Sequence, residues 1–287
     1  MSIKPRFYAL AVISLGVFLS ANVSADIVIS DNFDGTAGIG PALQLVDNDA
    51  GGGGGSFNND TGVVVSGTSN GSSAAAGFNN TDLVAVSSDV VAIKATFEID
   101  SVENVLFSRS NGFFLGLVTD NDASATVFGA TDTTGAGLYN NNNTSGIGLL
   151  INSATSQTTP LDEARIVSDG ASNNVTLQGL TIPSPADVED GFTFSITLNS
   201  DDTLDVSTTG LTTDINATGV AVDGDVVFAD FVANGVGVSA TFQGGGGGFT
   251  ADSVSVHLET AAEVVPEPSS LALLGLTTLG LVARRRR

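Results

Sequence analysis

Short apolar runs separated by clusters of glycine, asparagine and aspartate make up most of this chain. The runs are rich in valine, isoleucine and phenylalanine, which suit a pleated sheet, and several are apolar at every second position. Residues 192–198 read FTFSITL, so that apolar side chains alternate with threonine and serine along the whole run. Residues 90–99 alternate in the same way. Such a period predicts strands with one buried and one solvated face.

Fifteen segments have the composition of strands, and long helical patterns are absent. The strongest are residues 90–99, 113–119, 192–198, 203–208, 225–233, 235–242 and 252–259, and the weaker are 26–29, 43–46, 62–65, 83–86, 125–128, 147–151, 165–167 and 175–177. Polar residues between 198 and 203 predict a hairpin. The glycine runs at 51–55 and 244–248 are expected to be loop tips. We therefore expect one all-β domain at 26–262, a two-sheet antiparallel β-sandwich.

The first 25 residues have the pattern of an export signal. Lys4 and Arg6 precede an apolar stretch at 7–19, and the small residues up to Ala25 suit a signal peptidase. Cleavage is expected between Ala25 and Asp26, which leaves a mature chain that folds outside the cytoplasm. The sequence thus predicts an N-terminal signal helix that flanks the sandwich.

The last 25 residues, 263–287, have a different pattern. Pro266, Glu267 and Pro268 precede an uncharged stretch at 271–283, and the chain then ends in Arg284, Arg285, Arg286 and Arg287. A helix of this length reaches only ~20 Å, less than the ~30 Å of a bilayer core. The pattern therefore predicts a short transmembrane helix that is a weak anchor, with the arginines on the cytoplasmic side of the membrane.

This terminal arrangement resembles the PEP-CTERM sorting signal of exopolysaccharide-producing Gram-negative bacteria. The resemblance rests on the Pro-Glu-Pro motif at 266–268, the short helix with Gly275 and Gly280, and the four arginines. It implies recognition and cleavage by exosortase after signal peptidase has acted at the other end. The expected location is therefore the cell surface or the extracellular space, with only transient anchoring in the inner membrane.

The net negative charge of the chain limits the kinds of molecule that it can bind. The chain has 31 acidic and nine basic residues; without the two signals, three basic residues remain against 30 acidic ones, a formal charge of −27. Nucleic acid is excluded as a partner because almost nothing is available to neutralise phosphates. Anionic polysaccharide would be repelled unless divalent cations bridge the two. The chain has no cysteine, so neither disulfides nor thiolate metal sites are available.

The body resembles a concanavalin A-like or LamG-like jelly roll. The resemblance rests on the opening segment IVISDNFDGT at 27–36, the segment NGFFLGLV at 111–118 and the closing segment ADSVSVHLE at 251–259. It implies that the first and last strands pair side by side. The chain departs from sugar-binding members in having no tryptophan and only two tyrosines.

Catalytic chemistry has few candidates. The one histidine, His257, is expected on the polar face of a strand, where it makes a poor general base. Glu98, Asp100 and Glu103 match the E-x-D-x-x-E spacing of jelly-roll glucanases. They are either a glycoside-hydrolysing or carbohydrate-binding site or a solvated strand end, and the missing tryptophans favour the latter.

Two Asp-Asn-Asp segments are candidates for calcium. Asp47 and Asp49 flank one asparagine, and Asp120 and Asp122 flank another. Alternating oxygen ligands suit Ca²⁺, although neither segment has the full twelve-residue loop of an EF-hand. Such segments also form turns through their own backbone hydrogen bonds.

These observations favour a non-enzymatic, exosortase-sorted protein of the cell surface or extracellular matrix. Its expected role is structural or adhesive in biofilm or exopolysaccharide, with calcium as a candidate cofactor. The alternative is a carbohydrate-binding or glycoside-hydrolysing jelly roll that uses Glu98, Asp100 and Glu103.

Overall fold

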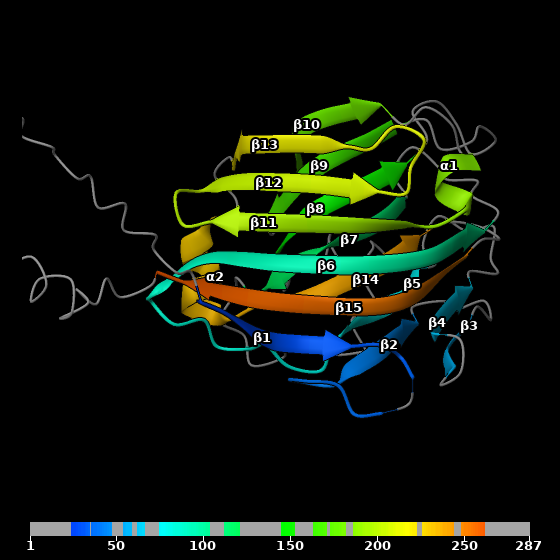
Figure 1. The fold of residues 1–287 in the computed structure, drawn as a ribbon, viewed down its shortest axis with the longest axis horizontal. Coiled ribbons are helices and arrows are strands. Elements are labelled where there is room, and N and C mark those ends of the chain that lie inside the picture. The colour runs from blue at the N-terminus through cyan, green and yellow to red at the C-terminus, as the bar shows by residue number, and fades with distance from the viewer. Residues whose placement is uncertain are drawn as a thin grey trace, which may run out of the picture. The chain divides into compact units, whose positions relative to one another are not determined.

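The computed structural model describes residues 24–34, 36–47, 54–58, 62–66, 75–103, 112–120, 145–152, 163–170, 173–181, 186–222, 226–243 and 248–261. Residues 24–260 form one compact unit of two stacked antiparallel sheets (Figure 1). The predicted all-β sandwich is therefore confirmed. The two terminal helices and the strand at 125–128 that were expected from the sequence lie outside the described residues.

The first sheet, here called sheet A, has eight strands. Its main path runs β13-β12-β11-β6-β15-β4-β3, and β1 pairs with the second half of β15. The strands are β1 (Ser24–Asp31), β3 (Gly54–Asn58), β4 (Gly62–Ser66), β6 (Val90–Glu103), β11 (Phe192–Asn199), β12 (Thr203–Thr209), β13 (Asn216–Ala221) and β15 (Gly248–Thr260). The first and last strands pair, as the jelly-roll resemblance implies, and β11 and β12 form the predicted hairpin.

The second sheet, sheet B, has seven strands in the order β10-β9-β8-β7-β14-β5-β2. They are β2 (Leu43–Asp47), β5 (Ala75–Asn80), β7 (Gly112–Thr119), β8 (Ser145–Asn152), β9 (Glu163–Gly170), β10 (Asn173–Thr181) and β14 (Gly237–Gln243). β7 to β10 follow one another as a meander, whereas β14 enters between β7 and β5 from much later in the sequence.

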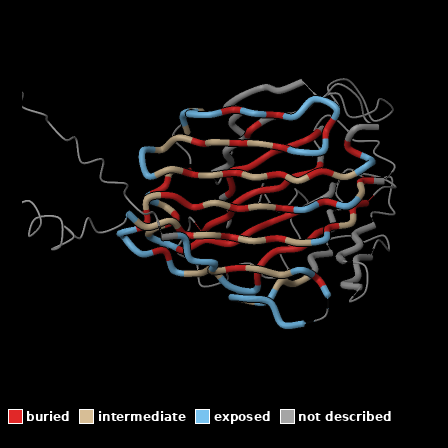
Figure 2. Tube along the Cα trace, in the orientation of Figure 1, coloured by how far each residue is buried: buried red, intermediate tan, exposed pale blue. Residues whose placement is uncertain are grey.

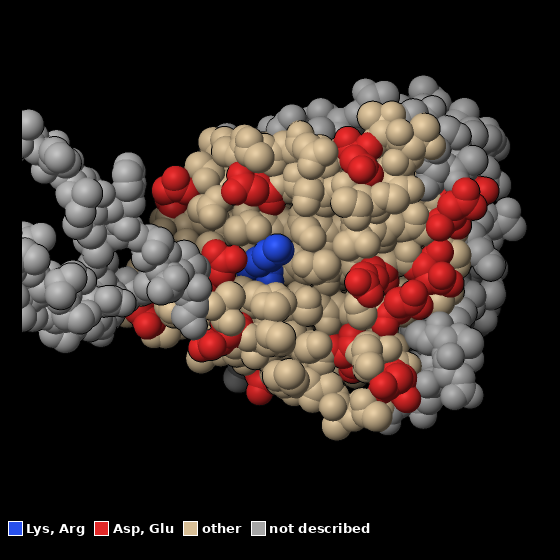
Figure 3. All heavy atoms as spheres, in the orientation of Figure 1, with Lys and Arg blue, Asp and Glu red and all other residues tan. Residues whose placement is uncertain are grey.

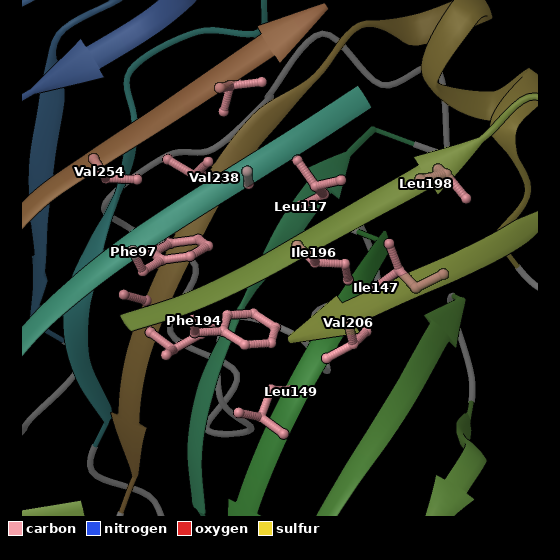
Figure 4. Close-up of a cluster of buried hydrophobic side chains, with 14 of the residues drawn as sticks. Phe97, Leu117, Ile147, Leu149, Phe194, Ile196, Leu198, Val206, Val238 and Val254 are labelled. Atoms are coloured by element: carbon pink, nitrogen blue, oxygen red, sulfur yellow. The ribbon is translucent and has the colours of Figure 1, made fainter. Parts of the chain in front are cut away.

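The inner faces of the two sheets share one apolar core (Figure 4). Phe97 and Phe194 lie stacked on neighbouring strands of sheet A, with ring centroids 6.0 Å apart. Across the interface, Phe113 of sheet B contacts Phe249 of sheet A at 4.8 Å between centroids. Buried and half-buried residues alternate along β11, in agreement with the alternation of apolar and polar residues in its sequence. The same alternation is visible along the strands of sheet A in Figure 2.

Two short helices lie at opposite ends of the sandwich, α1 (Ala186–Glu189) and α2 (Phe228–Asn234) (Figure 1). The strand predicted at 225–233 is wrong, because α2 occupies most of it. A strand would carry Asp230 on the same face as Phe228, whereas one helical turn buries Phe228 and Phe231 together and leaves Asp230 free to cap. The carboxylate of Asp230 accepts a hydrogen bond from the backbone of Val227 at 2.9 Å.

Several strand predictions need smaller corrections. Residues 83–86 do not form a strand; they contribute one isolated bridge, between Val84 and Val236. β3, β5 and β13 were not predicted, since their sequences GGSFN, AAGFNN and NATGVA are short of large apolar residues. β3 also begins inside the glycine run that was expected to be a loop tip. Pairing with a neighbouring strand, rather than intrinsic preference, forms these three strands.

Candidate functional site

Three carboxylates gather on the outer face of sheet A, where β6 pairs with β15. Glu98 and Asp100 are both exposed and point away from the core, because Phe97 and Ile99 between them are buried. Exposed Asp252 of β15 lies near both of them, as its electrostatic coupling to each shows. The backbone of Glu103 ends β6, and its side chain is outside the described residues.

The surroundings of these carboxylates are those of a solvated surface. The hydroxyl of Ser253 donates a hydrogen bond to Glu98 Oε2 at 2.7 Å. Partial burial raises the pKa of Asp252, and the charges of Asp100 and Glu98 raise it further. Asp252 was missed at the sequence level, since only the pairing of β15 with β6 brings it to residues 98 and 100.

A sugar-binding or sugar-cleaving site would be expected to place an aromatic side chain beside these carboxylates. Every phenylalanine whose side chain is described is buried, and the exposed large apolar side chains in the described ranges are Ile27 and Ile39. Figure 3 shows this face, with carboxylates set around a basic side chain among neutral residues. Among the described side chains, no group of three or more His, Cys, Asp or Glu is arranged to hold a metal ion.

His257 lies on this same face. Its neighbours Val256 and Leu258 are buried in the core, whereas His257 is half-buried and opposes Lys94 across the ladder. The predicted orientation is therefore confirmed. Among the described residues, the His257 side chain makes no hydrogen bond to a hydroxyl or a carboxylate, as the histidine of a hydrolytic triad does.

The first aspartates of the two Asp-Asn-Asp segments lie at opposite ends of sheet B. Asp47 ends β2. The strand pairings across β5 and β14 place it at the same height in the sheet as Phe113, at the start of β7. Asp120 directly follows the end of β7 and is buried. Seven residues of strand at ~3.3 Å each separate the two levels by about 23 Å. Asp49 and Asp122 lie outside the described residues, as does the side chain of Asp47.

A buried polar group on sheet B was not found from the sequence. The side chain of Asn80 bridges two backbone groups, since its Nδ2 donates to the carbonyl of Pro41 and its Oδ1 accepts from the amide of Val238. Beside it, Asn79 Oδ1 and Ser239 Oγ face each other across the β5–β14 ladder, and neither has a hydrogen-bond partner. Buried polar atoms of this kind are commonly satisfied by an internal water molecule.

The predicted signal cleavage site falls in β1. Ala25 and Asp26 are exposed strand residues that pair with Glu259 and Leu258 of β15. Cleavage between them would leave a strand that begins at Asp26. Pro266, Glu267, Pro268 and the four terminal arginines lie outside the described residues. Within the described residues, no helix is long and apolar enough to cross a membrane.

The terminal pattern has a match among protein families. Residues 264–287 match the family described as "PEP-CTERM protein-sorting motif". The chain carries a PEP-CTERM sorting motif. The motif marks an exported protein that is sorted to the cell surface, and it confirms the resemblance drawn from the prolines, the apolar stretch and the arginines. The match covers only the end of the chain and does not extend to the sandwich.

Solved structures resemble the sandwich. Peanut lectin in complex with a 9mer peptide shares 16% identity, with a TM-score of 0.51 over 83% of this chain and 99% of that one. Arcelin-5, a lectin-like defense protein from Phaseolus vulgaris, gives 12% identity and 0.49 over 84% and 100%. The exoplasmic domain of VIP36 in a Ca²⁺/Man-bound form gives 14% and 0.48 over 80% and 91%. The likeness to peanut lectin confirms the jelly-roll fold. No curated protein matches the sequence.

Proposed function

We propose that this protein is a non-enzymatic adhesive component of the cell surface or matrix, sorted by exosortase and attached to exopolysaccharide. The observation that carries the proposal is the joining of a lectin-type sandwich to a PEP-CTERM motif. The motif supports export and processing, and the fold supports polysaccharide as the partner. Biofilm is the setting in which a sorted, polysaccharide-binding domain would act.

The geometry of the carboxylates supports a role without catalysis. Glycoside hydrolysis requires an acid and a second carboxylate on either side of a bound sugar. Glu98, Asp100 and Asp252 instead lie on an open strand face, and no described aromatic side chain is exposed beside them. A glucanase that uses Glu98, Asp100 and Glu103 is the less supported alternative.

Co-sedimentation with purified exopolysaccharide tests the proposal. We expect the exported full chain to sediment with the polymer and to release no reducing sugar. The double variant Glu98→Gln, Asp100→Asn should bind equally well and serves as the matched control. Release of sugar that this variant abolishes would contradict a non-enzymatic role, and absence of binding would contradict adhesion.

Calcium is retained as a proposed cofactor at the two Asp-Asn-Asp segments. Because Asp47 and Asp120 lie at opposite ends of sheet B, we expect each segment to bind its own cation. A cation on the surface could also bridge this acidic protein to an anionic polymer.

A further inference from the structure

One exposed strand end has the features of a glycan acceptor. Residues 214–218 read Asp-Ile-Asn-Ala-Thr, which contains the Asn-x-Thr motif of N-linked glycosylation. Asn216, Thr218 and Asp214 are all exposed, whereas Ile215 and Ala217 between them face the core. The strand period therefore presents the acceptor, the hydroxyl and the carboxylate to solvent together.

The side chains of this motif are available for recognition. Asn216 and Thr218 make no side-chain hydrogen bond or ion pair within the described structure. Asp214 accepts one hydrogen bond at Oδ1, from the amide of Leu211 at 3.2 Å, which leaves Oδ2 open. Asn216 begins β13, which is the outermost strand of sheet A on this side (Figure 1). A transferase could approach it without displacing a neighbouring strand.

Other Asn-x-Ser/Thr sites in the chain lack one or more of these features. They begin at residues 22, 59, 70, 79, 142, 143 and 174. None of them has an acidic residue two positions before the asparagine, as Asp214 precedes Asn216. Asn79 is 1% exposed in the middle of sheet B, so a glycan there could not be accommodated in the fold. Asn79 is a natural internal control for accessibility.

We propose that Asn216 is an acceptor for N-linked glycan transferred by a bacterial oligosaccharyltransferase of the acid-requiring type. The co-reactant is an oligosaccharide joined to a lipid through diphosphate. The amide nitrogen Nδ2 of Asn216 forms a bond to the anomeric carbon, and the bond from that carbon to the diphosphate oxygen breaks. The lipid diphosphate leaves with the electron pair, and the amide loses one proton. Thr218 and Asp214 act in recognition by the transferase.

A glycan at this position would also protect the sheet. Among the described strands β13 pairs only with β12, so its other edge is not hydrogen-bonded to a described strand. An open edge is a template for pairing with another chain. A bulky, hydrated oligosaccharide at the start of β13 would hinder such pairing. The modification thus has a physical role that is independent of polysaccharide binding.

The test is peptide mass spectrometry of the full chain exported by Gram-negative cells that carry the transferase and its lipid-linked oligosaccharide. We expect the added mass on the peptide containing Asn216 and none on the peptide containing Asn79. Asn216→Gln and Thr218→Ala should each abolish it, Thr218→Ser should retain it, and Asp214→Asn should lower its occupancy. Circular dichroism should be unchanged in these variants, since all three side chains are exposed.

Two results would overturn the proposal. One is an unmodified Asn216 in cells where a known acceptor protein is glycosylated. The other is modification of Asn216 that persists in Thr218→Ala and Asp214→Asn, which would show transfer without recognition of this motif.

Discussion

The two sheets of the sandwich are buried in different ways. Along β11 and β12 of sheet A, buried residues alternate with half-exposed serines, threonines and other polar residues. Along β7 and β8 of sheet B, residues 113–119 and 146–151 are buried without interruption. Phe114, Val118 and Leu150 belong to a separate apolar cluster, apart from the shared core that contains Phe113 and Leu115. Sheet B is therefore covered on both faces in this region.

This difference explains the two kinds of strand sequence. FTFSITL has a clear period of two because one face meets water, whereas FFLGLVT has almost no polar position because neither face does. Glycine is required where the doubly buried strands approach closely. A Cβ at Gly148 would collide with the backbone carbonyl of Leu115 on the neighbouring strand. The choice of residues is therefore restricted on both faces of β7 and β8, whereas it is restricted on only one face of the half-buried strands of sheet A.

The largest expected effect comes from removing an outward-facing side chain of sheet B. Phe114→Ala should lower the free energy of unfolding by about 3–5 kcal/mol, because its ring is fully buried although it points away from the shared core. Phe194→Ala, in the shared core, should cost a similar amount. Urea unfolding followed by circular dichroism measures both changes.

The matched control is an outward-facing residue of sheet A. Ser207→Ala on β12 should change the free energy of unfolding by less than about 0.5 kcal/mol, because Ser207 is only half-buried and its side chain makes no hydrogen bond among the described residues. If Phe114→Ala were as mild as Ser207→Ala, the outer face of sheet B would not be structurally covered, and the comparison of the two sheets would fail.

Calcium should stabilise the ends of sheet B if the Asp-Asn-Asp segments bind it. At a calcium concentration a hundredfold above Kd, one site adds about 2.7 kcal/mol to the free energy of unfolding. Thermal scans with millimolar Ca²⁺ and with EDTA, at fixed ionic strength, measure this. Asp47→Asn and Asp120→Asn should each remove only the contribution of its own segment. A midpoint unaffected by EDTA would reduce both segments to turns.

The close approach of β7 and β8 predicts a cost for a single added methyl group. Gly148→Ala should destabilise the fold by about 1–3 kcal/mol, since the backbone of the neighbouring strand must move. Gly219→Ala on edge strand β13 is the comparison, because no atom lies within 4 Å of its added Cβ. It has a φ of +65°, so it should incur only the cost of about 1 kcal/mol for a left-handed backbone. Equal costs would remove the packing argument for sheet B.

The smallest effects are titrations of exposed carboxylates on the sheet A side. Burial, together with the charges of Asp100 and Glu98, raises the pKa of Asp252 in the folded protein. The folded state therefore favours the protonated carboxyl, and the protein loses stability as the pH rises through the folded pKa and the group ionises. Asp252→Asn should therefore be more stable than the parent at neutral pH and equal to it in strong acid. High salt should shrink the difference.

Asp34 provides a control of opposite sign. Hydrogen bonds from the side chain and backbone of Thr36, and from Asn32, lower the pKa of Asp34. Its contribution is present above the unfolded pKa and is lost as the pH falls through the folded one. Asp34→Asn should thus lower the thermal midpoint at neutral pH and leave it unchanged in strong acid. The same direction of change in both variants would contradict the assigned causes.

In both sheets, the sequence predicted the strands that have large apolar residues and missed those that lack them, namely β3 and β13 of sheet A and β5 of sheet B. A half-buried strand such as β11 reveals its period and both of its ends, whereas β5, with the sequence AAGFNN, is polar in composition and becomes a strand only by pairing with β2 and β14. The helix α2 was mistaken for a strand because a short apolar run has no clear period. Glu98 and Asp100 could be assigned to one face, but Asp252 joined them only through long-range pairing.

The most direct test of the account is the fate of the full chain in cells with and without exosortase. Fractionation and intact-mass measurement should find the sandwich outside the cell, without its terminal arginines, only when exosortase is present. Replacing Pro266, Glu267 and Pro268 by alanine should retain the unprocessed chain at the membrane, as loss of exosortase does. An identical mass and location in all three strains would contradict sorting by this motif and, with it, the proposed place of the sandwich in the extracellular matrix.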